Sequence, residues 1–177
     1  SERSRGLGDV YKRQPIYLLG AAMEHHHRMI SEMPDLVQTS AIESGKRAFS
    51  MSGYKPNDMS TIQLYDAFTI NTLLFLEDLG FCKKGEAKEL VKNNNIGPAG
   101  NLKVNTNGGG LSCVHPGMYG LFVTLEALRQ LRNASGDDVG KRLNGGWIDN
   151  AKLSVAHGNG GVLSSQVTNI WGVSDTL

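Results

Sequence analysis

Short apolar runs alternate with helical periods along this chain, and no other feature of the sequence restricts its fold as much. Residues 15–22 form an apolar run that fits a buried strand, and residues 35–53 repeat small and apolar side chains with a helical period. Residues 61–68 begin with strand-like alternation and lead into a second helical segment. Residues 152–156 and 162–171 are typical of two further strands around the glycine turn HGNGG. Because strands and helices alternate, we predict an α/β domain with one layered core.

The clearest helical period lies shortly after the middle of the chain. Its apolar residues fall on one face of a helix: Met118, Leu121, Phe122, Leu125 and Leu128. The following residues, 133–146, are polar and are predicted to form a loop. The same apolar stretch carries Glu126 and Arg129, so it does not have the composition of a membrane span.

Composition and charge exclude several classes of protein. The 177 residues carry a net charge of +1, which provides no basic field to attract nucleic acid. The two cysteines, Cys82 and Cys113, are too few for a disulfide framework. We therefore expect a reduced intracellular protein, placed in the cytoplasm, or in peroxisomes or mitochondria if the source is eukaryotic.

The first fourteen residues, SERSRGLGDVYKRQ, are set apart from the rest. They have no hydrophobic period and resemble translated sequencing-adapter sequence, so we exclude them from the fold. A disordered basic tail is the alternative. On the adapter interpretation the natural protein continues upstream of Pro15, and residues 15–177 are a fragment of it.

One cluster of polar and aromatic residues lies where a predicted strand ends. Tyr65 and Asp66 begin the sequence YDAF, and strand ends are where sites gather in α/β folds. The alternative is structural: a core tyrosine beside an aspartate that caps a helix.

Two glycine-rich clusters follow. Residues 105–110 (NTNGGG) include Asn107, Gly108 and Gly109, and glycines of this kind let a ligand approach the backbone amides. His115 follows just before the long helix, where an imidazole can donate to an oxyanion. The third cluster, residues 156–161 (AHGNGG), lies at another strand end and includes Gly158. A turn with a hydrogen-bonded histidine and a tight hairpin are the structural alternatives.

Other candidate sites are weaker. His25, His26 and His27 are adjacent, and neighbouring residues do not face one another on a regular element, so we predict no metal site. Cys113 has nothing near it in sequence that would lower its pKa, so a small buried thiol is favoured over a nucleophile.

Together the three clusters resemble the C-terminal domain of thiolases, especially the sterol-carrier and lipid-transfer branch. Residues 64–87 resemble the thiolase segment that carries an Asn-Glu-Ala-Phe or His-Asp-Cys-Phe motif. Residues 105–117 resemble the Asn-x-x-Gly-Gly segment that leads to Gly-His-Pro, and residues 154–166 resemble the final Cys-x-Gly segment. The resemblance covers residues 15–177. It implies a mixed sheet with helices on both faces, forming half of a two-domain protomer.

The resemblance also implies roles for particular residues. His115 matches the thiolase histidine that helps form an oxyanion hole, and Tyr65 occupies the position that orients water or binds the thioester oxygen. The second catalytic cysteine of thiolases is replaced here by Ala156, with His157 beside it as a substitute acid or base. The nucleophilic cysteine of thiolases belongs to the N-terminal half. We therefore expect this fragment to be inactive alone.

Three functions follow from the resemblance. The first is acyl transfer on acyl-CoA thioesters, by thiolytic cleavage or Claisen condensation, with coenzyme A as substrate or acyl carrier and no metal. The second is retro-aldol cleavage of β-hydroxyacyl-CoA with a small OB-fold partner, in which Tyr65 and Tyr119 are the acid and base candidates. The third is a non-catalytic module that binds acyl-CoA or lipid. Thiolases are dimers or tetramers, so the resemblance also implies a homo-oligomer.

Overall fold

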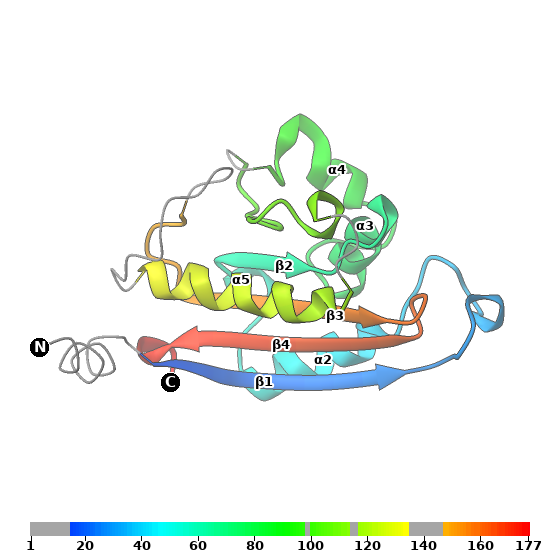
Figure 1. Ribbon diagram of the computed structural model, residues 1–177, viewed down its shortest axis with the longest axis horizontal. Coiled ribbons are helices and arrows are strands. Elements are labelled where there is room, and N and C mark those ends of the chain that lie inside the picture. The colour runs from blue at the N-terminus through cyan, green and yellow to red at the C-terminus, as the bar shows by residue number, and fades with distance from the viewer. Residues whose placement is uncertain (1–14, 98–99, 114–116, 135–146) are drawn as a thin grey trace, which may run out of the picture.

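A four-stranded mixed sheet with helices on both faces forms the framework of the chain (Figure 1). The computed structural model describes residues 15–97, 100–113, 117–134 and 147–177. The strands lie in the order β1–β4–β3–β2, where β2 and β3 are parallel and the other neighbours are antiparallel. This confirms the predicted α/β class. The strands and helices are β1 (Ile16–His25), α2 (Ala41–Ser52), β2 (Thr61–Leu64), α3 (Thr69–Asp78), α4 (Ala87–Val91), α5 (Tyr119–Ala134), β3 (Leu153–Gly160) and β4 (Ser165–Val173).

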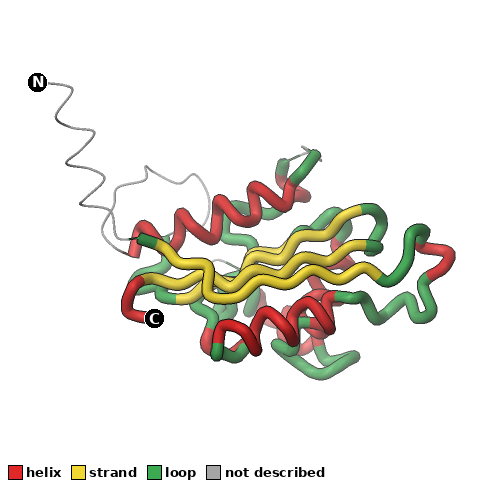
Figure 2. The backbone as a smooth tube through the Cα atoms, turned by 90° about the horizontal axis from the view of Figure 1, so that it is seen from below, coloured by secondary structure: helices red, strands yellow, loops and turns green. Residues whose placement is uncertain are grey.

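The two faces of the sheet are covered by different helices (Figure 2). Helix α2 packs on β1 and β4, and α5 packs on the opposite face over β3 and β2. The larger buried cluster lies on the α2 and α3 side and includes Ile62, Phe75, Val155 and Ile170. Within the described parts of the chain, no helix is long and apolar enough to cross a bilayer.

The approach of α2 to β1 depends on one glycine. A Cβ atom on Gly20 would lie 2.2 Å from the carbonyl oxygen of Ala48, so no other residue fits without moving the helix. At the other end, Gly53 closes α2 with a φ of 75°, a conformation that glycine adopts without strain. The helix begins at Ala41, later than the period from residue 35 predicts.

Helix α5 packs on the sheet with its less apolar face. Tyr119, Val123 and Ala127 are buried against β3, whereas the apolar stripe of the sequence points away. The exposed fractions of the stripe are 85% for Met118, 61% for Leu121, 46% for Phe122 and 41% for Leu125. The helix itself is confirmed, but its strongest apolar face is not buried by this domain.

The glycine turn predicted between the last two strands is shorter than expected. Strand β3 continues through residues 157–160 because these residues pair with β4 as far as Gly160 and Ser165. The connection is reduced to residues 161–164. The HGNGG prediction of a turn was therefore wrong for most of its length, and its residues are displayed along a strand instead.

Candidate functional site

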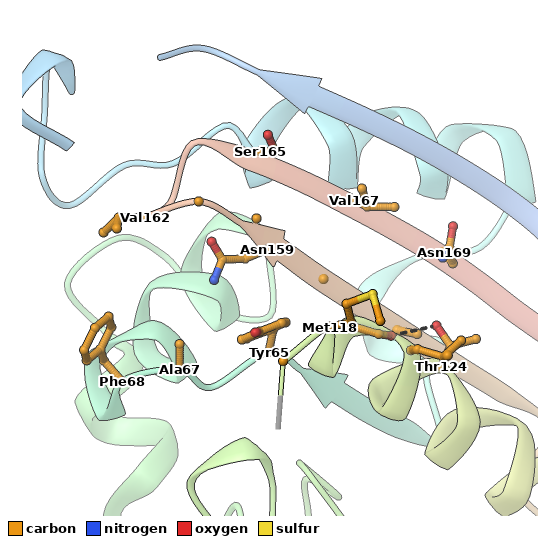
Figure 3. A pocket seen from close by; sticks show the side chains of 17 residues that line it. Tyr65, Ala67, Phe68, Met118, Thr124, Asn159, Val162, Ser165, Val167 and Asn169 are labelled. Atoms are coloured by element: carbon orange, nitrogen blue, oxygen red, sulfur yellow. Dashed lines mark hydrogen bonds between the residues drawn. The ribbon is translucent and has the colours of Figure 1, made fainter. Parts of the chain in front are cut away.

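A pocket of about 1110 Å³ opens beside the first turn of α5 (Figure 3). Its walls come from the segment after β2, from the start of α5, and from one face of β3 and β4. Side chains of every second residue line it along β4, where Ser165, Val167 and Asn169 share a face. The pocket is mostly apolar, with a few amides and hydroxyls, which is the usual make-up of a small-molecule site.

Tyr65 brings the first sequence cluster to this pocket. Its backbone N–H donates to the carbonyl oxygen of His157 at 2.9 Å, which extends the pairing of β2 with β3 by one residue. Its side chain lines the pocket. The ring meets that of Tyr119 edge to face, with centroids 5.4 Å apart and an interplanar angle of 85°.

Tyr119 lies behind Tyr65 and is not in the pocket lining. It is 2% exposed, and its hydroxyl donates to Oδ1 of Asn107 at 3.2 Å. Burial raises the pKa of the Tyr119 hydroxyl well above its ordinary value of 10.0, although the hydrogen bond to Asn107 opposes the shift. A base needs a lowered pKa, so this environment keeps Tyr119 protonated as a hydrogen-bond donor.

The second sequence cluster contacts the first through the carboxylate of Asp66. Asp66, 4% exposed, accepts hydrogen bonds from the backbone N–H of Gly110 and, at 3.5 Å, of Leu111. Burial raises the pKa of the Asp66 carboxyl, against the lowering by these bonds. A Cβ on Gly109 would lie 2.1 Å from the Asp66 carboxylate, which explains a glycine there.

The residues of the glycine segment that were predicted to bind a ligand instead make contacts within the protein. Asn107 accepts from the N–H of Gly109 at 3.0 Å as well as from Tyr119. Asn107, Gly108 and Gly109 are not in the pocket lining, whereas Gly158 is. His115 lies outside the described residues.

His157 is on the opposite face of the sheet from the pocket. Ala156 and Gly158 line the pocket, and strand alternation turns the residue between them away. His157 is fully buried, with Nδ1 2.9 Å from Oγ1 of Thr168 and Nε2 2.8 Å from Oε1 of Gln166. Desolvation lowers the pKa of its imidazole to about 4. The structure therefore gives His157 no contact with the pocket, and it does not replace the thiolase cysteine there.

Some pocket residues were not singled out from the sequence. Thr124, Ser165 and Asn169 contribute hydroxyls and an amide to the lining. Two-residue alternation along residues 162–171 was the signal that could have found Ser165 and Asn169. In the part of the chain that the structure describes, no group of three or more His, Cys, Asp or Glu gathers to hold a metal.

We expect removal of the Asp66 carboxylate to loosen the glycine segment. Asp66→Ala leaves the part-buried backbone N–H groups of Gly110 and Leu111 without their acceptor, so the free energy of unfolding should fall by about 1 to 2 kcal/mol. Asp35→Ala is the control, because Asp35 also accepts a backbone N–H, from Val37 at 2.9 Å, but at an exposed site; there the loss should be at most about 0.5 kcal/mol. Urea unfolding measures the loss in each variant. Equal small losses would show that the Asp66 carboxylate does not stabilise the glycine segment.

Comparison with known proteins identifies the class to which this fold and pocket belong. A family model described as thiolase C-terminal domain-like matches residues 22–173. The chain belongs to this family, as the three sequence motifs implied.

The names of individual relatives indicate different reactions. A 17-hydroxy-3-oxo-4-pregnene-20-carboxyl-CoA lyase of Mycobacterium tuberculosis is 37% identical over 135 residues, which are 72% of this chain and 34% of the relative. An acetyl-CoA acetyltransferase of Methanothermobacter thermautotrophicus is 28% identical over 163 residues, 91% of this chain and 40% of the relative. The solved structure of an Ltp2-ChsH2(DUF35) aldolase superposes with a TM-score of 0.69 at 28% identity, covering 93% of this chain and 41% of that one. The chain thus spans about a third to two fifths of the length of these relatives.

Proposed function

We propose that this chain is the C-terminal half of a thiolase-like enzyme that acts on acyl-CoA thioesters, with acyl transfer as its reaction. The observation that carries the proposal is the pocket at the first turn of α5, where the YDAF segment, the start of α5 and the AHGNGG strand meet. The positive end of a helix dipole favours the charge that develops on a thioester oxygen. The relatives that act on CoA esters support the substrate class.

The exposed face of α5 supports the view that another part of the protein covers it. The 16-residue helix α5 exposes Leu121, Phe122 and Leu125 while its other side is buried on the sheet, and of these three Leu121 also lines the pocket. Exposed apolar patches of this kind mark interaction surfaces. The relatives are also more than twice as long as the matched segment. We propose that an N-terminal half packs on this face and supplies the nucleophilic cysteine.

In the proposed acyl transfer, a thiolate from the N-terminal half attacks the β-keto carbonyl of a β-ketoacyl-CoA, and the tetrahedral oxyanion collapses with cleavage of the carbon–carbon bond. The leaving enolate takes up a proton to become one acyl-CoA, and the thiolate of a second coenzyme A then takes the acyl group from the cysteine to give the other. Tyr65 is the described side chain with a hydroxyl that lines the pocket from the YDAF segment, so we assign it to binding the thioester oxygen or to orienting a water. Tyr119 positions the Tyr65 ring. Gly158 gives the substrate access to the β3 backbone.

Retro-aldol cleavage is a second candidate, and Ala156 is the observation that favours it. Ala156 lines the pocket where thiolases carry a cysteine that exchanges a proton. A retro-aldol step needs no thiol: a base takes the proton of the β-hydroxyl, the carbon–carbon bond breaks, and an acid returns a proton to the enolate carbon. The aldolase neighbour is a complex named Ltp2-ChsH2(DUF35), so this candidate brings a small partner protein with it.

One assay separates the candidates. The coding sequence upstream of residue 15 is recovered, and the full-length protein is incubated with a β-ketoacyl-CoA plus coenzyme A or with a β-hydroxyacyl-CoA alone. Acyl transfer predicts two acyl-CoA products from the first mixture. Retro-aldol cleavage predicts one acyl-CoA and one carbonyl compound from the second. Binding of acyl-CoA without product from either mixture would leave a binding module, and absence of binding would refute the proposal.

A further inference from the structure

A buried carboxylate on α5 has no part in the proposed chemistry. Glu126 is 2% exposed and lies on the inner face of the helix. Its Oε1 accepts hydrogen bonds from Oγ1 of Thr106 and, at 3.0 Å, from Nε2 of Gln130. A buried carboxylate lowers stability unless hydrogen bonds compensate it, so the role of Glu126 is to be sought in the residues that it binds.

The loop residue that Glu126 binds is also held from the sheet. Nε2 of Gln63, on β2, donates to Oγ1 of Thr106 at 2.9 Å, and the backbone N–H of Thr106 donates to Oε1 of Gln63 at 3.3 Å. Gln63 is 1% exposed. Thr106 is therefore fixed between β2 and α5 through its side chain and its backbone.

The next residue along the loop carries this placement to the site. Asn107 follows Thr106 and accepts the Tyr119 hydroxyl. Tyr119 and Glu126 are both on the buried side of α5, about two turns apart. The consecutive loop residues Thr106 and Asn107 are thus bonded to α5 at two places along the helix. The bond between Asn107 and Tyr119 holds the ring against which Tyr65 packs.

We infer that Glu126 is a positioning residue: through Thr106 it fixes the 105–110 segment on α5, and so sets the place of Tyr119 behind the pocket-lining ring of Tyr65. The inference deepens the proposed function and rests on it for the effect on turnover. Its structural half, the placement of the loop, stands without any reaction.

Two substitutions of Glu126 distinguish positioning from bulk stability. Both bonds end on a single oxygen, so Glu126→Gln can accept both through its own Oε1, whereas Glu126→Ala accepts neither. The matched control is Asp78→Ala. Asp78 is also a buried carboxylate, 6% exposed, and it accepts the hydroxyl of Thr39 at 2.7 Å, away from the pocket lining.

Turnover is measured on the full-length protein and corrected for the folded fraction. Glu126→Ala should lower kcat about 10-fold or more, because small displacements of site groups are costly, with the dissociation constant of the acyl-CoA within about 2-fold. Glu126→Gln should stay within about 3-fold of the parent, and so should Asp78→Ala.

Amide hydrogen exchange on the chain itself tests the loop placement independently of any activity. The N–H of Gly109 should exchange about 10-fold faster or more in Glu126→Ala and at the parent rate in Glu126→Gln and Asp78→Ala. Unchanged exchange in Glu126→Ala, an equal acceleration in Asp78→Ala, or equal impairment of Glu126→Gln and Glu126→Ala would overturn the inference. A full-length protein without turnover in which exchange follows the expected pattern would refute the proposed function alone.

Discussion

Replacing Tyr65 by phenylalanine should lower kcat/KM of the full-length enzyme about 100-fold, since positioned proton donors and acceptors contribute at least that much to many reactions. The substitution removes only the hydroxyl and keeps the ring that packs against Tyr119. Affinity for the acyl-CoA should change little, because the remaining pocket lining is intact. Steady-state turnover with the substrate identified by product analysis measures the effect.

Tyr54→Phe is the matched control for this prediction. The Tyr54 hydroxyl donates to the carbonyl oxygen of Thr176 at 2.9 Å and is not part of the pocket lining. Its loss should leave kcat/KM within about 2-fold while costing about 1 kcal/mol of stability. If Tyr65→Phe were as active as Tyr54→Phe, Tyr65 would have no chemical role, and its place in the pocket would be one of packing.

The stability of the chain should fall in mild acid because of His157. The pKa of the folded imidazole is about 4, below the ordinary value of 6.5 expected in the unfolded chain, so the unfolded state takes up the proton first as pH falls. The contribution is complete above about pH 6.5, is lost between pH 6.5 and 4, and declines no further below that. The total loss should be about 3 kcal/mol, which corresponds to the difference between a pKa of about 4 in the folded chain and 6.5 in the unfolded chain.

Denaturant unfolding at a series of pH values measures this dependence. In His157→Gln the steep part of the profile between pH 6.5 and 4 should disappear, whatever the variant's stability at neutral pH. His26→Gln is the control, because the His26 side chain is exposed; this variant keeps His157, so the steep part of the profile should remain. A His157→Gln profile parallel to that of the parent would show that another group causes the acid sensitivity.

The sequence predicted the order of the elements and the position of Tyr65, but not the orientation of α5. Hydrophobic periodicity identifies a helix and its apolar face, and that face is normally assigned to the nearest core. Here Tyr119, Val123 and Ala127 pack on the sheet, while Leu121 and Phe122 point outward. Periodicity alone cannot orient this helix, because the face that packs on the sheet is less apolar than the face that stays exposed.

The misjudged role of His157 has a different cause. The HGNGG sequence predicts a turn, in which neighbours such as Ala156 and His157 can serve the same site. In the structure it is a strand, and alternate residues of a strand face opposite ways. Local propensity does not predict that the strand continues to the pairing of Gly160 with Ser165, because glycines usually weaken strands. In a strand over these residues, alternation places Ala156 and His157 on opposite faces of the sheet.

The most direct test of the central claim is isothermal titration of an acyl-CoA into the full-length protein and its Val167→Trp variant. Val167 lines the pocket from β4, so an indole there should fill the space that we propose the substrate occupies. We predict a dissociation constant on the order of 1–100 μM, in the range of ordinary substrate affinities, and at least about 10-fold weaker binding in the variant. No measurable binding, or equal affinity in the two proteins, would contradict the assignment of this pocket to acyl-CoA thioesters.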